Sequence, residues 1–175
     1  MNTWKIDPTH SEVNFKVKHL LVSTVTGTFN KFDAKIVTNR EDFSDAKITF
    51  EAEVNSISTK NDQRDGHLKS PDFFDAVKYP KSTFVITSIS PIATAKTGEA
   101  THKVKGNLTI KDKTNEIAFD AIVNIQPDKI TCTGTAAVDR SKFDVRYGSK
   151  AFFPDIGDKI IYDEFRLKFN LIAVK

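Results

Sequence analysis

The chain has 175 residues, the usual length of one domain and enough to bury a real core, so we expect a single domain over residues 1–175. Its net charge of +3 comes from 26 Lys and Arg against 23 Asp and Glu, with the two signs mixed along the chain. There is no basic run of the kind that nucleic-acid surfaces use, and no apolar run approaches the roughly 18 residues of a membrane-spanning helix, so neither nucleic-acid binding nor an integral membrane span is expected.

A single cysteine, Cys132, excludes an internal disulfide and fits a reducing compartment. The N-terminus shows no charged segment followed by an apolar one. We therefore expect a soluble, cytoplasmic protein as the sequence stands, or a periplasmic one if a signal peptide has been removed. The unusual count is 14 Phe against one Trp and three Tyr, and such a composition favours an apolar interior.

The first third of the chain predicts strands. Residues 4–6 form a short strand before a turn, and strict alternation of apolar and polar residues over 12–19 predicts a half-buried strand. A longer strand pattern covers residues 22–37. Its apolar set changes parity between Phe29 and Phe32, which predicts a β-bulge at Asn30–Lys31. Residues 46–54 form the cleanest amphipathic strand.

Residues 62–75 form a long connection that combines charged and aromatic residues. Asp62 can cap a short helix, and Pro71 ends it. Phe73 and Phe74 supply apolar surface that opposes disorder. We therefore expect a helical lid whose phenylalanines point into the protein. The alternative is a structural plug that meets no ligand.

Five further strand patterns follow the lid, over residues 82–91, 102–110, 117–125, 130–138 and 165–171. In the first of these, Phe84 and Ile86 are expected on one face, with Val85 and Ile89 on the other. A second irregular segment, residues 139–163, precedes the last strand.

About eight strands, each with one apolar and one charged face, predict a single interior. Short polar turns predict antiparallel neighbours. Closing the sheet into a barrel gives eight strands one interior economically, and a sandwich is the alternative. Several patterns exceed the typical strand of about five or six residues. The barrel would therefore be tall and could hold a long linear apolar molecule.

The strand over residues 130–138 carries small side chains on its apolar face: Ile130, Cys132, Gly134, Ala136 and Val138. The threonines of the other face are expected to point outward. Small inward residues forfeit packing contacts in a filled core, so they favour a cavity. The alternative is that the phenylalanines fill the interior completely.

Several stretches resemble the YceI-like family of polyisoprenoid-binding proteins: Trp4–Ser11, Phe15–His19, Ser56–Thr59, Arg64–Asp75 with Tyr79–Pro80, Val104–Ile110 and Asp139–Phe143. The resemblance covers essentially the whole chain and is most specific in the lid. It implies an all-β fold, an extended eight-stranded antiparallel lipocalin-like barrel with a short helical lid around residues 62–75. Asp112–Lys113 departs from the family pattern, where a glycine is expected in many relatives, and this affects the turn type only.

The resemblance also implies a function, the non-catalytic binding, storage or transport of a long-chain isoprenoid lipid, for example an isoprenoid quinone. The tail would lie inside the barrel and the head near its mouth, and no cofactor would be required. Homodimer formation is left open. The residues expected to contact the ligand are Phe15, Val17, His19, Val25, Phe29, Phe50, Arg64, His67, Phe73, Phe74, Phe84, Leu108, Phe119, Ala136 and Phe143.

The alternative function is a lipid-modifying hydrolase that uses the His, Asp and Arg residues of the lid, among them His67 with Asp72 and Asp75. No spacing resembles a zinc signature, and there is no nucleophile elbow or Gly-rich phosphate loop, so no metal or catalytic site is expected. We instead expect Arg64 to pair with Asp65 or a neighbouring carboxylate, and His67 to fix the lid by hydrogen bonds. Binding of a lipid head group by either residue or by His19 is a third role.

Overall fold

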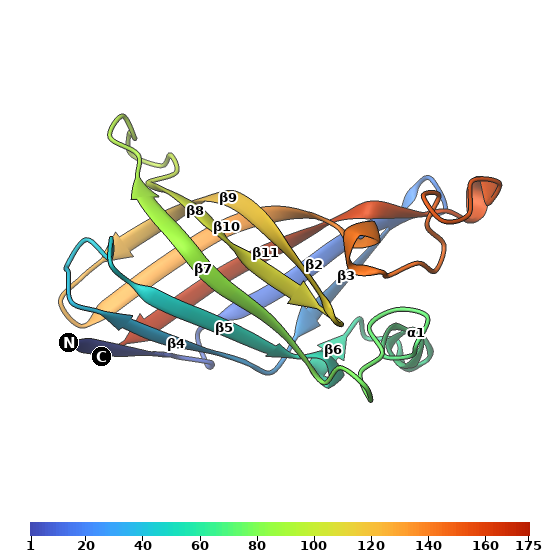
Figure 1. Ribbon diagram of the computed structural model, residues 1–175, viewed down its shortest axis with the longest axis horizontal. Coiled ribbons are helices and arrows are strands. Elements are labelled where there is room, and N and C mark those ends of the chain that lie inside the picture. Colours follow the sequence, from blue (N-terminus) through green and yellow to red (C-terminus); the bar gives the residue numbers. More distant parts are fainter.

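The computed structural model describes all 175 residues and consists almost entirely of antiparallel β-strands (Figure 1). The strands are β1 (Asn2–Ile6), β2 (Glu12–His19), β3 (Ser23–Phe29), β4 (Phe32–Thr38), β5 (Lys47–Glu53), β6 (Ile57–Ser58), β7 (Lys81–Pro91), β8 (His102–Ile110), β9 (Lys113–Ile125), β10 (Lys129–Asp139) and β11 (Ile161–Val174). The helical elements are α1 (Asp62–Leu68) and the 3₁₀ turns η1 (Val54–Ser56), η2 (Arg140–Phe143) and η3 (Gly157–Lys159). None of them is long and apolar enough to cross a bilayer.

The sheet closes on itself. Its strand order is β1-β4-β5-β7-β8-β9-β10-β11-β2-β3-β6, and β1 also pairs with β11. β1 and β2 lie one after the other along β11, because Lys5 pairs with Val174 and Val13 with Phe169. β3 and β4 follow one another in the same way, so the chain forms an eight-position antiparallel barrel. The fold class expected from the sequence is confirmed.

The strand expected over residues 22–37 is divided into β3 and β4. The apolar set changes parity at Asn30–Lys31 as predicted, but the extra residues lie in the neighbouring segment, between β5 and β6. Lys31 O accepts from Glu53 N (2.9 Å), and Asn30 N donates to Ser56 O (3.1 Å), so these two residues face the whole of the η1 connection. The bulge was therefore assigned to the wrong strand. The alternation within one strand shows that the inward face changes, but it does not show whether the extra residues lie in that strand or in the segment paired with it.

A bulge that the sequence pattern missed occurs in β7. Ile86 pairs with Gly106 and Ser88 with Lys105, which leaves Thr87 as an extra residue. The bulge returns Ile89 to the inner face with Phe84 and Ile86, while Val85 is exposed. The prediction that Ile89 shares the face of Val85 is wrong, because one extra residue reverses the alternation.

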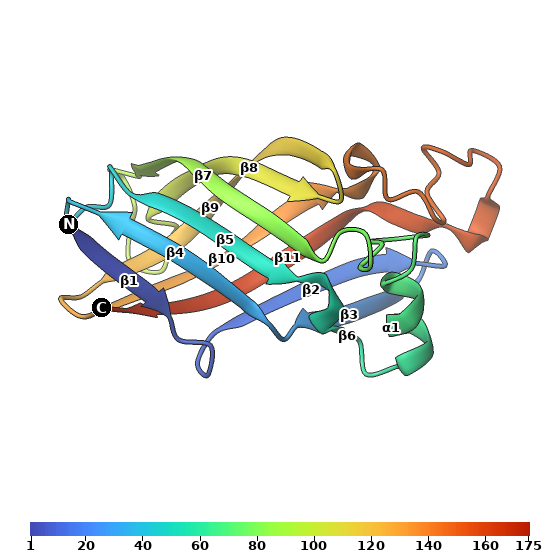
Figure 2. The ribbon, with the colours of Figure 1, turned by 60° about the horizontal axis from the view of Figure 1, so that its bottom comes forward.

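The barrel has two distinct ends (Figures 1 and 2). The termini end carries both chain ends and a core of six buried hydrophobic residues: Trp4, Ile6, Ile36, Phe43, Ile130 and Ala173. The lid end carries α1 and the segment between β10 and β11, with a core of twelve: Phe15, Val25, Val54, Ile57, Phe73, Ala76, Leu108, Ile110, Val138, Phe143, Val145 and Phe165.

Candidate ligand-binding cavity

A cavity of about 270 Å³ occupies the barrel interior. Of the 38 residues that line it, 34 are hydrophobic, and the four others are Ser82, Thr83, His102 and Arg140. A single buried water needs only about 10–15 Å³, and small-molecule pockets usually measure about 300–1,000 Å³. The side chains therefore leave a cavity just below the usual size range of ligand sites, and its lining is almost wholly apolar.

Ten of the fifteen residues expected to contact a ligand line this cavity. They come from the strands around the barrel and from the lid: Phe15, Val17, Phe29, Phe50, Phe73, Phe74, Phe84, Leu108, Phe119 and Ala136. The period-two alternation of a strand places such residues on one face, so the sequence was informative wherever the strands are regular.

The other five do not line the cavity. Val25 and Phe143 belong to the lid-end core, where they pack against other side chains. His19 lies at the end of β2 and pairs with Ile161 across the strands. Arg64 and His67 are held in the lid by local hydrogen bonds. None of the three polar residues proposed for a lipid head group therefore lines the cavity.

Three phenylalanine rings cover glycines of the barrel wall: Phe15 covers Gly27, Phe84 covers Gly106 and Phe169 covers Gly134. Phe15 of β2 pairs directly with Gly27 of β3, and Phe169 of β11 pairs with Gly134 of β10. A Cβ on Gly134 would lie 2.7 Å from Phe169 Cζ, and a Cβ on Gly27 would clash with the Phe15 ring. The glycines thus keep bulky rings close to the wall and away from the barrel axis.

The small-residue strand β10 contributes less open space than its sequence implies. Ile130, Cys132 and Ala136 line the cavity as expected. The room beside Gly134, however, is taken by the Phe169 ring. The small inward residues of β10 therefore do not all border open space. Burial in these apolar surroundings raises the pKa of the Cys132 thiol to about 11, so the thiol is neutral.

The lid helix begins and ends differently from the sequence-based expectation. Its N-cap is Asn61, whose Oδ1 accepts from Arg64 N (3.0 Å), and Asp62 is the first helical residue. The helix ends at Leu68, before Pro71, so Phe73 and Phe74 lie in turns. Asn and Asp are equally good caps, and sequence alone could not separate adjacent candidates.

Asp65 and Arg64 anchor the lid to Thr59, which follows β6. The buried Asp65 Oδ1 accepts from Thr59 N (2.8 Å) and Thr59 Oγ1 (2.6 Å). Arg64 donates from Nε to Thr59 Oγ1 (2.8 Å) and from Nη2 to Thr59 O (3.1 Å). The expected pairing of Arg64 with a carboxylate is therefore wrong, since Asp65 is already satisfied by the threonine.

His67 connects the lid to the segment between β10 and β11. Its Nε2 lies 2.9 Å from Asp72 Oδ2, so the expected fixing of the lid by hydrogen bonding is confirmed. The ring also lies edge-on to Phe73 and Tyr147, with centroid distances of 4.9 and 4.5 Å. Asp72 is the one carboxylate bonded to His67, and no group of three or more His, Cys, Asp or Glu side chains is placed to hold a metal ion.

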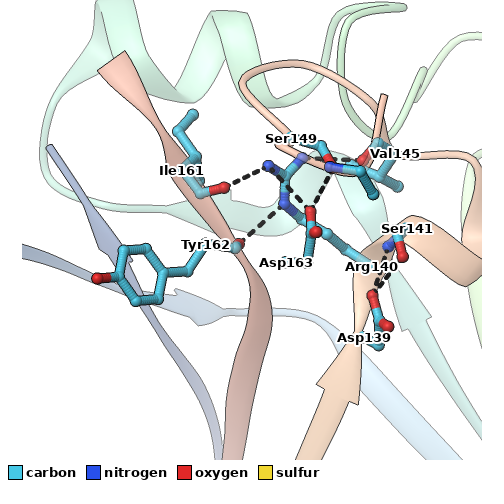
Figure 3. Close-up of polar contacts among 9 residues, drawn as sticks. Asp139, Arg140, Ser141, Val145, Ser149, Ile161, Tyr162 and Asp163 are labelled. Carbon is cyan, nitrogen blue, oxygen red and sulfur yellow. Dashed lines mark hydrogen bonds and ion pairs between the residues drawn. The ribbon is translucent and has the colours of Figure 1, made fainter. Parts of the chain in front are cut away.

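Arg140, which the sequence analysis did not select as a site residue, lines the cavity. Apart from His102, it is the only lining residue that can carry a positive charge. It follows β10 directly and is 4% exposed. Its guanidinium donates to three backbone carbonyls, Tyr162 O (3.1 Å), Val145 O (2.8 Å) and Ile161 O (2.9 Å) (Figure 3). The family-like stretch Asp139–Phe143 was the available signal.

Carboxylates complete this network. Asp163 Oδ1 lies 3.8 Å from Arg140 Nη2 and also accepts a hydrogen bond from the fully buried Ser149 hydroxyl. Asp139 accepts from Ser141 N and Oγ, which caps η2. Burial lowers the pKa of the Arg140 guanidinium, while the charges of Asp163 and Asp139 act in the opposite direction. The network fastens both ends of the β10–β11 segment to the barrel.

His102 is the polar residue that lines the cavity at the termini end. Its Nδ1 lies 2.8 Å from Thr101 Oγ1. Burial lowers the pKa of the imidazole, and the charge of Asp42 partly opposes this. A neutral imidazole is compatible with the apolar lining around it.

The comparisons with known proteins agree with this architecture. A family model described as a YceI-like domain matches residues 4–173. A UPF0312 protein of Staphylococcus aureus (strain USA300) is 38% identical over 156 residues, which cover 84% of each chain. Burkholderia cenocepacia BcnA superposes with a TM-score of 0.79 at 26% identity, over 95% of this chain and 98% of that one. A polyisoprenoid binding domain from Saccharophagus degradans, implicated in plant cell wall breakdown, superposes with a TM-score of 0.73 over 98% of this chain and 97% of that one. Its sequence identity is 15%, so this likeness shows the fold alone.

Proposed function

This chain belongs to the YceI-like family, and on that premise we propose that it binds, stores or transports a long-chain isoprenoid lipid inside the barrel without converting it. The single observation that carries the proposal is the cavity, in which 34 of 38 lining residues are hydrophobic. The polyisoprenoid-binding neighbour from Saccharophagus degradans supports the ligand class.

The energetic scale supports a chain-like apolar ligand. Each buried methylene is worth about 0.8 kcal/mol, so a five-carbon isoprene unit contributes roughly 3–4 kcal/mol. A few units offset an association cost of about 4–15 kcal/mol. Affinity should therefore rise with chain length until the cavity is full. Because the cavity is just below the usual size range of ligand sites, a long chain also requires some phenylalanine rings to change rotamer.

The polar end of the ligand is assigned to the lid end, beside Arg140. A guanidinium has five N–H groups, and three of those on Arg140 are used by backbone carbonyls. Nη2 also lies 3.8 Å from Asp163 Oδ1, so the second N–H of Nη1 is the donor that we assign to a ligand oxygen, such as that of a carbonyl or a phosphate. Nothing comparable faces the cavity at the termini end, where His102 is the polar residue.

Mass spectrometry of organic extracts from gently purified protein tests the proposal directly. An isoprenoid lipid should be recovered in stoichiometric amount, and added isoprenoids of increasing length should bind with increasing affinity. Recovery of no lipid, together with no binding of added isoprenoids, would overturn it. Homodimer formation stays a prediction, for which sedimentation of the purified protein is the measurement.

A hydrolase is the competing function. Incubation with an isoprenyl diphosphate should return the substrate unchanged, both for the parent and for His67→Ala. Metal-dependent hydrolysis that disappears in His67→Ala would show that the lid is catalytic.

A further inference from the structure

A groove on the outer wall of the barrel gathers positive charge. Among its twelve lining residues one is hydrophobic, none is acidic, and four are basic. The four cations come from three parts of the chain, β2, β11 and the connection between β6 and α1. We call them the basic strip: Lys16, Lys60, Arg166 and Lys168. The other lining side chains are mainly hydroxyl groups and one amide, which can donate hydrogen bonds to an anion.

The strand register places like charges opposite each other in this strip. Lys16 pairs directly with Arg166 across the β2–β11 ladder, and Lys168 lies two residues further along β11. Directly opposed like charges destabilise a sheet. Arg166 has a single acidic neighbour, Glu164 at 3.8 Å, and both side chains are exposed. The three lysines of the strip make no ion pair, so their positive charge is available to an anionic partner.

Beyond the strip, β2 continues into an exposed apolar turn. This tip, Leu20–Val22, joins β2 to β3, and its three side chains are 50%, 53% and 90% exposed. Leu20 and Leu21 have φ of 50° and 66°, a region that bulky residues rarely adopt. Leu20 N donates to Ile160 O (2.8 Å), which holds the tip against the β10–β11 segment. Large side chains kept in an unfavourable, exposed turn indicate a contact outside the chain.

The strip and the tip share strand β2. This strand runs toward the lid end of the barrel, where its turn into β3 lies near the β10–β11 segment (Figures 1 and 2). Lys18 is exposed and lies on β2 between Lys16 and the tip. At the other edge of the strip, Lys60 follows Thr59, the residue that anchors the lid through Asp65. A partner bound to the strip would therefore contact the connection between β6 and α1, which anchors the lid.

We propose that the lid end docks on an anionic lipid bilayer, with the basic strip against the phosphate head groups and the Leu20–Val22 tip among the upper acyl chains. Cations beside exposed aliphatic side chains are the pattern of interfacial binding. A bilayer is favoured over an acidic protein because it is also the source of the ligand assigned to the cavity, so this inference rests on the proposed function. Docking places the lid next to the lipid that it admits.

Flotation with phosphatidylcholine vesicles, with and without one-third phosphatidylglycerol, tests the proposal. The parent protein should bind the anionic vesicles, and added salt should release it. Lys16→Gln with Lys168→Gln should weaken binding by about thirtyfold, because each cation near such a surface is worth about 1 kcal/mol. The matched control is Lys103→Gln with Lys105→Gln, which removes two exposed charges from β8 on another wall and should leave binding unchanged.

The apolar tip is tested by Leu21→Asn with Val22→Ser, where Asn tolerates the positive φ of Leu21. Binding should fall by about tenfold even in low salt. Its control is Val85→Ser, an exposed apolar residue on β7. Equal binding to neutral and anionic vesicles would overturn the role of the strip, and binding to neither would overturn docking and leave the surface to an acidic protein. Lipid retained by a protein that binds no vesicle would refute docking alone, whereas vesicle binding without any bound isoprenoid would refute the proposed function alone.

Discussion

The two ends of the barrel are closed by different means. At the termini end, Trp4 and Phe43 pack with ring centroids 5.7 Å apart, and Thr38 donates to Asp45 Oδ1 (2.5 Å) to hold the short loop that carries Phe43. At the lid end, two long segments meet through His67, Phe73 and Tyr147. They are fastened to the barrel by a few polar anchors, chiefly Arg140 and Asp65.

This difference predicts where a ligand of the proposed class would enter the barrel. The termini end buries its apolar cluster within strands and one short loop, so opening it would break the ladder that closes the barrel. The lid end uses irregular segments whose local contacts can break while the strands stay paired, and such regions open at lower free-energy cost. We therefore expect lipid uptake at the lid end and mainly structural support at the other.

The largest expected effect comes from removing the plug at the termini end. Trp4→Ala should lower the stability of the lipid-free protein by about 3–5 kcal/mol, or roughly 10 °C in melting temperature, because a 4% exposed ring leaves a void. Trp4→Phe should cost much less, since it also removes the buried Nε1, which has no hydrogen-bond partner. Folded Trp4→Ala protein should retain lipid. Loss of lipid in proportion to loss of stability would erase the distinction between the ends.

The lid should separate stability from retention. Phe73 is 6% exposed and belongs to the lid-end core, whereas Phe74 is only half-buried against it, although both line the cavity. Phe73→Ala should therefore lower stability by about 3 kcal/mol. Phe74→Ala should cost less than half of that and mainly weaken lipid retention. Thermal melts with and without added isoprenoid measure both, and equal, negligible effects would mean that the lid is a loose surface loop.

Arg140 is expected to affect both the stability of the lid end and the retention of lipid. Arg140→Met leaves three carbonyls without their donor, and we expect a loss of roughly 3 kcal/mol together with weaker retention of lipids that carry a polar head. Arg166→Met is the matched control, because its exposed guanidinium has one acidic neighbour at 3.8 Å and should contribute about 0.5 kcal/mol or less. Similar melting curves for the two variants would argue against the anchor.

The barrel wall between the two ends tests the cavity itself. Ala136→Phe places a ring in the space next to Ala136, which is buried and lines the cavity, and should abolish lipid binding with about 1 kcal/mol or less change in lipid-free stability. In a filled core the same change would cost roughly 1–3 kcal/mol or more. Ala137→Phe, on the exposed face of β10, should alter neither property. A large loss of lipid-free stability only in Ala136→Phe would contradict the cavity.

The smallest effect concerns acid stability at the termini end. The hydrogen bond from Thr38 holds the pKa of Asp45 below its ordinary value of 3.8. A carboxylate with a depressed folded-state pKa stabilises the protein above pH 3.8, and this contribution is lost as the pH falls through the lowered value. Asp45→Asn should therefore reduce the acid sensitivity of the melting temperature below about pH 4. An unchanged acid limb would show that Asp45 does not control this loop.

The sequence by itself determined the features that depend on neighbours along the chain. Alternation over β2, β5 and β10 identified the inward faces, and the parity change after Phe29 located the irregularity at Asn30–Lys31, although it was interpreted as a bulge within one strand. Aromatics beside a turn-rich segment located the lid. These patterns are local, since the period of two in a strand decides which side chains share a face before any partner strand is known.

Only the tertiary structure decided the features that join residues far apart in the chain. In the sequence Arg140 is only a charged residue that follows a strand, whereas in the folded protein it donates hydrogen bonds to the carbonyls of Ile161 and Tyr162. The sequence predicts open space beside Gly134, but the register with β11 places the Phe169 ring there. The basic strip likewise exists because Lys16 and Arg166 face each other across β2 and β11. Closing the barrel fixes which strands become neighbours, and that pairing is a property of the whole chain and not of any one segment.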